Sequence, residues 1–416
     1  MRGFLLLTVL LSLCNSLHAQ DWDRRHRFAK SYFGVSTFVS PSMQNGSFAN
    51  ASGEVVQYER SGFLSPAVNI GATHFWGHAD FYISINTSAI KLGDDELENS
   101  IYLGTFTGLR VYPLPSKPGN IRPYLGYKFS PLRSRQTDVS GQKYRFTQVK
   151  SVFDVGLGWQ LPNFYVTIEY GRVVNPSFDT YLSRTIQGRD RFPTQLLQIG
   201  LNYTIDSTQP ANTKASRAAN ELFSGTNQYG FFFGIGPSAA FPIASSEYIT
   251  EQYPFLDDRA MPRIFPDLVV GYHFTKTDLV TALSFRPMTQ KREAYGFEQT
   301  INRNSLILEA YQFLGDYHGF APYLGIGLSY ENLQLSEVDN GTSISDVTQN
   351  KFSPAVVFGW DIRPSEKGDW WVLRTNLRYS PFLRFSHREQ DLSLQHLEFN
   401  FIQFVMYPQR RKKVSG

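Results

Sequence analysis

Cysteine is almost absent from this sequence. Of the 416 residues only Cys14 is a cysteine, and it lies near the N-terminus, so the rest of the chain has no disulfide to stabilise it. After the N-terminal segment, no run approaches the roughly 18 uninterrupted apolar residues of a transmembrane helix. The formal net charge is +4, and removing Arg2 lowers it to +3. This near neutrality argues against a nucleic-acid-binding protein.

The N-terminal segment, "MRGFLLLTVLLSLCNSLHAQ", has the layout of a secretory signal. One positive charge at Arg2 precedes the apolar run 4–13, which is too short to span a bilayer as a helix. Leu13 stands before Cys14, where a lipoprotein signal requires a small residue. We therefore predict that residues 1–19 are a signal peptide, cleaved near Ala19, and that the mature chain is exported.

Aromatic residues and glycine are abundant, and they recur in runs with a period of two. Aromatic residues make up 15% of the chain and charged residues only 18%. In "IYLGTFTGLRVY", which begins at Ile101, one face is apolar apart from threonine, and the other carries Tyr, Gly, Phe and Arg110. Such alternation over about ten residues, bounded by turn-forming clusters, predicts a half-buried β-strand.

The runs divide into two sets of eight predicted strands. The first set covers residues 32–40, 66–75, 79–87, 100–113, 122–131, 149–160, 163–173 and 194–204. The second set covers residues 229–240, 265–275, 279–288, 305–314, 321–331, 352–362, 370–382 and 398–407.

Two near-identical phrases connect the sets. "RPYLGYKFS" (122–130) and "APYLGIGLS" (321–329) are the fifth strand of each set, and their prolines, Pro123 and Pro322, lie 322 − 123 = 199 residues apart. We interpret the chain as two diverged copies of one eight-stranded unit.

The connections alternate in length. Those after the second, fourth and sixth strands of each set are short, and those after the odd-numbered strands are long and hold most of the charge. Transmembrane barrels have this pattern, with short periplasmic turns and long extracellular loops. We predict a first barrel unit at 20–204, a periplasmic linker at 205–228, a second barrel unit at 229–407 and a basic periplasmic tail at 408–416.

Alternation alone also fits a soluble sandwich or barrel with an apolar interior. The polar face argues against it, because this face carries mostly Gly, Ser, Asn and Tyr with single charges, as in the lumen of a small barrel. A Lys or Arg facing lipid near the midplane costs about 2–4 kcal/mol, so charges on this face fix its direction inward. The predicted lumen charges are Asp80, Arg110, Lys128, Asp154 and Glu169 in the first unit, and Asp267, Arg286, Glu309, Glu331, Arg374 and Arg378 in the second.

Aromatic residues lie at many strand ends, as in the girdles that flank a barrel's apolar band. The predicted interfacial aromatics are Tyr32, Trp76, Trp159, Tyr203, Tyr229, Trp360, Trp370, Trp371 and Tyr407.

With the strands around them, "APYLGIGLSYE" and "RPYLGYKFSP" resemble the OmpA/OmpX-like family of eight-stranded outer-membrane β-barrels. The resemblance covers most of each half, and its motifs are specific for architecture and poor for function. It implies an all-β transmembrane antiparallel barrel inserted by the outer-membrane assembly machinery, with both ends of each unit periplasmic. One departure is the C-terminus, where "PQRRKKVSG" follows the last strand in place of a terminal aromatic residue.

Sixteen strands allow two architectures. We favour two tandem eight-stranded barrels over one sixteen-stranded barrel, because the linker is far longer than the other short turns and each unit nearly balances its own lumen charge. Tandem barrels predict a structural, adhesive or ligand-binding protein that acts through its extracellular loops, in contact with outer-membrane lipid and lipopolysaccharide. A single large barrel predicts a diffusion porin.

Catalytic and metal-binding motifs are weak. His74, His78 and Asp80 flank a tight turn, but their spacing matches no known zinc pattern. Ser386-His387 with Glu389 is the nearest set to a lipid-modifying hydrolase, yet neighbouring strand residues point to opposite faces. We therefore predict no enzyme activity, metal or cofactor.

Overall fold

The computed structural model describes residues 30–49, 54–87, 89–92, 99–137, 141–206, 230–274, 276–315, 320–363 and 371–411. The predicted signal peptide lies outside these residues, as do Tyr229, Trp370 and nearly all of the predicted linker. Among the described residues, no helix is both long and apolar enough to cross a membrane.

Eight strands form a first closed ring. Each strand pairs antiparallel with its neighbour, and β12 returns to β1, with Leu201 opposite Val35. Short hairpins, β4–β5 (Ala89–Leu92, Asn99–Leu103) and β10–β11 (Ser177–Tyr181, Gln187–Arg191), extend it at one end. The wall strands are Lys30–Ala49 (β1), Val55–His74 (β2), Ala79–Asn86 (β3), Phe106–Val111 (β6), Ile121–Thr137 (β7), Lys143–Gln160 (β8), Phe164–Val174 (β9) and Gln195–Asp206 (β12).

A second ring repeats this topology. Here β22 closes onto β13, with Phe404 opposite Ile235. Helix α3 (Glu247–Gln252) and hairpin β20–β21 (Arg384–His387, Gln390–Ser393) lie in its longer connections, and α4 (Pro408–Arg411) follows the last strand. The wall strands are Gly230–Pro242 (β13), Phe265–Phe274 (β14), Leu279–Ala294 (β15), Phe297–Phe313 (β16), Phe320–Asp339 (β17), Thr342–Ile362 (β18), Trp371–Ser380 (β19) and His396–Met406 (β22).

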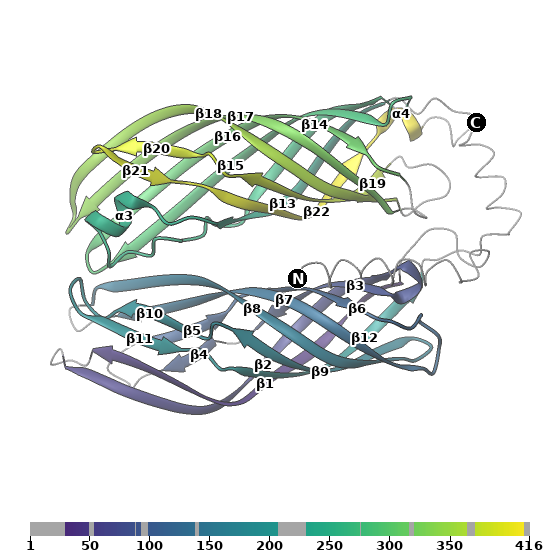
Figure 1. Ribbon diagram of the computed structural model, residues 1–416, viewed down its shortest axis with the longest axis horizontal. Coiled ribbons are helices and arrows are strands. Elements are labelled where there is room, and N and C mark those ends of the chain that lie inside the picture. Colours follow the sequence, from purple (N-terminus) through teal and green to yellow (C-terminus); the bar gives the residue numbers. More distant parts are fainter. Residues whose placement is uncertain are drawn as a thin grey trace, which may run out of the picture.

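The strand pairings decide between the two predicted architectures. Both edges of β12 are occupied, by β9 and β1, and both edges of β13 are occupied, by β14 and β22. The chain therefore forms two tandem eight-stranded barrels, which confirms the favoured prediction, and the alternative sixteen-stranded wall is not formed. Figure 1 shows the barrels side by side, with the long hairpins at one end and helix α4 at the other. We call these the hairpin end and the linker end.

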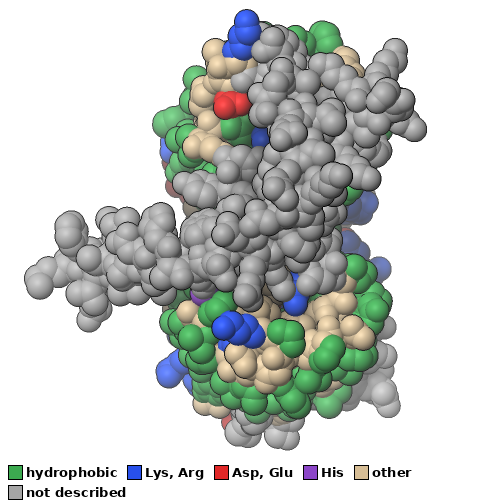
Figure 2. All heavy atoms as spheres, turned by 90° about the vertical axis from the view of Figure 1, so that its right-hand side faces the viewer, with side chains coloured by type: hydrophobic (Ala, Val, Ile, Leu, Met, Phe, Trp, Pro, Cys, Tyr) green, Lys and Arg blue, Asp and Glu red, His purple; other side chains and the backbone are tan. Residues whose placement is uncertain are grey.

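The outer surface of both barrels is apolar. Leu125 is 69% exposed and Ile326 is 68% exposed, and apolar residues alternate outward along the neighbouring strands. Seen from the linker end, hydrophobic side chains form a rim around the first barrel (Figure 2). Side chains this apolar are stable on an outer surface only in contact with lipid or another protein, as in a transmembrane barrel.

The duplicated phrase has a packing explanation. Tyr124 lies opposite Gly156 in the next strand, and Tyr323 lies opposite Gly359. A Cβ added to Gly156 would lie 2.5 Å from the Tyr124 ring, and one added to Gly359 would lie 2.4 Å from the Tyr323 hydroxyl. Each tyrosine therefore requires glycine beneath it, so the two copies retain this geometry.

The strands extend beyond their predicted limits at the hairpin end. The predicted strands 321–331 and 352–362 are the lower parts of β17 and β18, which continue to a two-residue turn at Asn340 and Gly341. Both turn residues have positive φ, 46° and 82°, as a type I′ hairpin turn requires. The second unit therefore has a tall β-hairpin where the sequence pattern predicted a loop.

The barrels contact each other along their height. Phe81 packs on Trp360 toward the linker end (ring centroids 5.7 Å apart), Phe129 packs on Phe241 (5.4 Å), and Tyr144 stacks on Tyr295 at the hairpin end (5.5 Å). Polar contacts join the hairpin ends, where the Thr147 amide donates to the Asp257 carboxylate at 2.7 Å. Arg184 of the first barrel also pairs with Asp339 of the second.

Candidate functional site: buried charge networks and a pocket at the hairpin end

The structure brings the five predicted lumen charges of the first barrel together. Arg110 lies 2.9 Å from Asp80 and 3.0 Å from Glu169, and Lys128 pairs with Glu169 and, at 3.1 Å, with Asp154. These side chains are at most 3% exposed. Leaving a charge unpaired at this depth costs several kcal/mol, so the pairing stabilises the network as a fixed set of ion pairs within the lumen.

The second lumen is organised around Arg378. Its guanidinium pairs with Asp267 at 2.7 Å and also with Glu309. Glu398 lies 3.0 Å from Arg378 and pairs with Arg286 as well. Glu331, another of the six predicted residues, accepts a hydrogen bond from Ser305 at 2.8 Å.

Sequence reasoning missed Asp361, Glu398 and Arg303. Asp361 makes a two-point ion pair with Arg374, at 2.6 and 2.8 Å. Asp361 and Glu398 are within one residue of the end of a predicted strand, Arg303 lies two residues before the start of one, and all three share the inward parity of their neighbours. Following the alternation to the strand ends, and past the end at Arg303, would have found them.

Aromatic clusters fill each lumen toward the linker end. In the first barrel Arg110 lies over the Tyr82 ring, 3.7 Å from its centroid, and in the second Arg374 lies over Phe232 at 5.0 Å. The buried aromatic residues are Tyr32, Tyr82, Tyr112, Tyr124 and Tyr165 in the first barrel, and Phe232, Tyr311, Phe313, Tyr323 and Tyr407 in the second.

The predicted interfacial position is therefore wrong for two aromatic residues, Tyr32 and Tyr407. Tyr407 is 1% exposed and Tyr32 is 3% exposed, because both rings point into a lumen. Tyr32 donates a hydrogen bond to Asp80 at 2.8 Å. Strand-end aromatics face inward or outward by parity, and a terminal position alone does not distinguish the two.

Of the other predicted interfacial aromatic residues, some are exposed on the outer wall and others pack against neighbouring side chains. Trp159 and Tyr203 each expose 42% of their surface on the outer wall. Trp360 contacts Phe81 of the first barrel, and Trp371 packs on Phe404. The side chain of Trp76 lies outside the described residues.

The weak catalytic and metal motifs do not assemble into a reactive site. Ser386 is exposed whereas His387 is buried, so they point apart as strand geometry predicts. The His387 Nε2 atom instead faces both Ser345 Oγ (3.3 Å) and Glu337 Oε2 (3.7 Å). One nitrogen cannot relay a proton between a nucleophile and an orienting acid, which takes both ring nitrogens. No group of three His, Cys, Asp or Glu side chains in the described parts of the chain could hold a metal.

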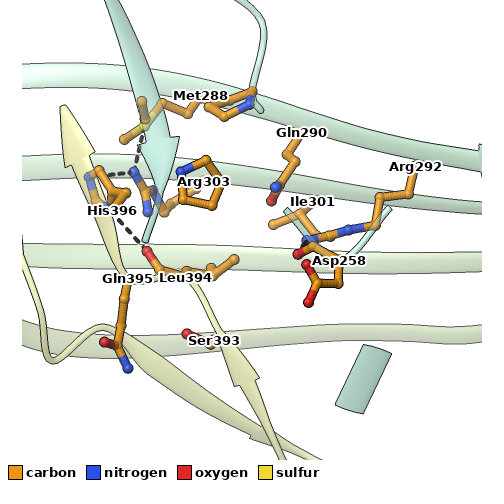
Figure 3. A pocket seen from close by; sticks show the side chains of 13 residues that line it. Asp258, Met288, Gln290, Arg292, Ile301, Arg303, Ser393, Leu394, Gln395 and His396 are labelled. Atoms are coloured by element: carbon orange, nitrogen blue, oxygen red, sulfur yellow. Dashed lines mark hydrogen bonds between the residues drawn. The ribbon is translucent and has the colours of Figure 1, made fainter. Parts of the chain in front are cut away.

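A pocket lies inside the second barrel at the hairpin end (Figure 3). Its walls come from β13, β15, β16, the segment before β14 and the turn between β21 and β22. Of its lining residues only Pro242, Asp258 and Pro262 are half-buried, so they mark its opening. The buried lining residues are Ala240, Met288, Gln290, Arg292, Ile301, Arg303, Ser393, Leu394, Gln395 and His396.

Two titratable groups near this pocket have shifted pKa values. Burial raises the pKa of Asp257 to about 7. Burial lowers the pKa of the neighbouring Arg292 to about 10. Both groups lie at the hairpin end, beyond the apolar band of the barrel, and both shifts arise because a charged form is disfavoured when it is removed from water.

The fold, the outer apolar band and the paired lumen charges define a class: a tandem transmembrane β-barrel protein with filled interiors. No protein-family model matches the chain, and no curated protein matches it.

Solved structures of outer-membrane proteins are similar to it in part. The attachment invasion locus protein Ail of Yersinia pestis, solved with the heparin analogue sucrose octasulfate, has 14% identity and a TM-score of 0.28, over 43% of this chain and 97% of that one. OprG of Pseudomonas aeruginosa has 14% identity and a TM-score of 0.30, over 42% and 95%. OmpT of Vibrio cholerae has 8% identity and a TM-score of 0.19, over 91% and 99%.

Proposed function

We propose that this protein is a non-conducting outer-membrane protein whose two barrels anchor a ligand-binding surface at the hairpin end. In this proposal the hairpin end is extracellular and the linker end periplasmic, because transmembrane barrels place their long connections outside. The outer-membrane assembly machinery inserts the chain, and outer-membrane lipid and lipopolysaccharide surround it.

The observation that carries the proposal is the packing of both lumens. From the linker end upward, each barrel holds an aromatic cluster, then an ion-pair network, then further apolar side chains. An eight-stranded barrel is just wide enough for side chains to fill, and in the described residues the ion pairs occupy the space across each lumen that a water channel would need. We therefore assign ligand binding to the hairpin end, where the strands extend beyond the apolar band and enclose a pocket.

Single-channel conductance tests the proposal. Purified mature protein, folded in detergent and added to planar bilayers, is expected to give no stable current steps. Heat-modifiable gel mobility confirms that the sample is folded, and sedimentation with the outer-membrane fraction tests its location. Large, ohmic steps from folded protein would overturn the proposal and indicate a channel.

A further inference from the structure

Two arginines in the hairpin-end pocket differ from the four arginines of the ion-pair networks. Arg110, Arg286, Arg374 and Arg378 each pair with a carboxylate at hydrogen-bonding distance. Within the described residues, neither Arg292 nor Arg303 has such a partner. Both nevertheless are buried, with 2% and 6% of their surface exposed.

The partners of Arg303 are weak acceptors. Its Nη2 atom contacts the Met288 sulfur and lies 3.3 Å from His396 Nε2 (Figure 3). Its Nε atom makes no hydrogen bond within the described part of the chain, and the nearest carboxylate oxygen, on Glu331, is 3.6 Å away. A guanidinium has five N–H donors, so Arg303 has unused capacity inside the pocket.

Among the described residues, Arg292 is hydrogen-bonded only to neutral groups. It donates to the Asp257 main-chain oxygen at 2.8 Å and to the Gln299 side chain at 2.6 Å.

A second unused donor is Ser393, which is 9% exposed and whose hydroxyl has no hydrogen-bond partner among the described residues. Unsatisfied buried donors are rare in native proteins, and an unrecorded ligand is one of their explanations.

The charge of the lining favours an anion. Two guanidiniums and the Asp258 carboxylate leave one positive charge, and Asp258 faces Arg259 outside the pocket at 3.8 Å. His396 has its Nδ1 atom 2.9 Å from the Leu394 main-chain oxygen, so its other nitrogen faces Arg303 as an acceptor and the ring is neutral. Glu337 and Glu398 lie behind the lining, where other donors hold them. Glu331 also lies behind it, where it accepts from Ser305 and has its second carboxylate oxygen 3.6 Å from Arg303.

The size and walls of the pocket restrict the anion. Its accessible volume is about 30 Å³, which holds about two to three water-sized groups, so formate fits without movement of the walls and acetate fits with a small shift of the walls. Met288, Ile301 and Leu394 supply the apolar part of the lining.

We propose that this pocket binds a small carboxylate of formate or acetate size, held by Arg303 and Ser393 with Arg292 as the second positive charge. The inference deepens the proposed function, on which it rests for the direction from which the ligand arrives. The ligand enters between Pro242, Asp258 and Pro262.

Calorimetric titration of the full-length folded protein with sodium formate, acetate, butyrate and benzoate, at constant chloride, tests this. Formate and acetate are expected to bind saturably and benzoate not at all. Arg303→Gln is expected to weaken formate binding about ten- to hundredfold, as the loss of a charged hydrogen bond does. Ser393→Ala is expected to weaken formate binding about two- to tenfold. Because it removes only one hydroxyl, it remains available as the test if Arg303→Gln fails to fold.

Arg133→Gln, which alters an exposed residue of the first barrel, is the matched control and should leave binding unchanged. Absence of saturable binding to the wild type would overturn the inference, as would equal binding of all four carboxylates or unchanged binding in both pocket variants. Conductance is measured on the same sample. A conducting protein that binds formate overturns only the proposed function, and a silent protein that binds none overturns only this inference.

Discussion

Arg378 holds three carboxylates in one lumen, those of Asp267, Glu309 and Glu398. Removing it would leave buried negative charges without their main counter-ion, and breaking a buried ion pair costs about 3–5 kcal/mol. We expect Arg378→Met to lower the free energy of unfolding by at least that amount, measured by urea titration of tryptophan fluorescence in detergent micelles.

Arg384 provides the control for that measurement. It pairs with Asp391, but the two side chains are 54% and 47% exposed, and such surface pairs contribute about 0–1 kcal/mol. Arg384→Met should therefore change the unfolding free energy little. Equal effects of the two substitutions would mean that the Arg378 network does not stabilise the barrel.

The sequence predicted which face of its strand each charged side chain occupies, but not which charges form ion pairs with each other. Alternation identified Glu309, Arg374 and Arg378 as facing one lumen, because parity is a local property of a strand. Glu309 pairs with Arg378, however, and Arg374 pairs with Asp361. Which charges meet depends on the tilt and stagger of the closed barrel, which no single strand encodes.

Strand β17 makes the membrane assignment testable at the scale of one element. Ile326 and Gln334 lie on its outer face, and both are exposed, but Ile326 is within the apolar band and Gln334 is beyond it. We expect Ile326→Arg to destabilise the folded protein by about 2–4 kcal/mol in lipid, because arginine near the midplane faces hydrocarbon. Refolding equilibria in phospholipid vesicles measure this.

Gln334→Arg is the matched control on the same strand and face. It should change stability by no more than about 0.5 kcal/mol, as is usual for surface substitutions. If both substitutions were equally mild, the outer face of β17 would not contact lipid.

The upper half of β17 shows where prediction at this scale failed. Above Glu331 the outer face becomes polar, so the apolar alternation that defines a strand in sequence fades. The Asn340-Gly341 pair, a strong hairpin signal, was present in the sequence and marks the turn. The apolar alternation in the sequence therefore indicates only the lipid-facing part of a strand, whereas the turn-forming residues indicate where the strand ends.

At the scale of the whole molecule, Asp257 joins the barrels at the hairpin end. Its carboxylate accepts from the Thr147 amide, and its neighbours include Arg292 and Asp258. Burial raises its pKa from an unfolded value of about 3.9 to about 7, so the folded state favours the protonated form. The contact should be most stable below about pH 4 and should weaken as pH rises towards 7.

We expect hydrogen exchange at Thr147, corrected for the intrinsic effect of pH, to become faster between about pH 4 and pH 7 and to change little above that. Asp257→Asn keeps an oxygen acceptor and removes the titration, so exchange in this variant should not change with pH after correction. Identical pH dependence in the wild type and the variant would assign the effect to another group.

The sequence by itself determined which face of each strand is apolar, where the tight turns lie and that the unit occurs twice. These follow from local alternation, from turn residues and from the tyrosine-on-glycine packing that both copies retain. The tertiary structure alone decided that β12 returns to β1 and β22 to β13, because closure joins strands more than 150 residues apart. It also decided that the two barrels dock side by side and that Arg292 and Arg303 share one pocket, since these contacts depend on how the closed walls tilt.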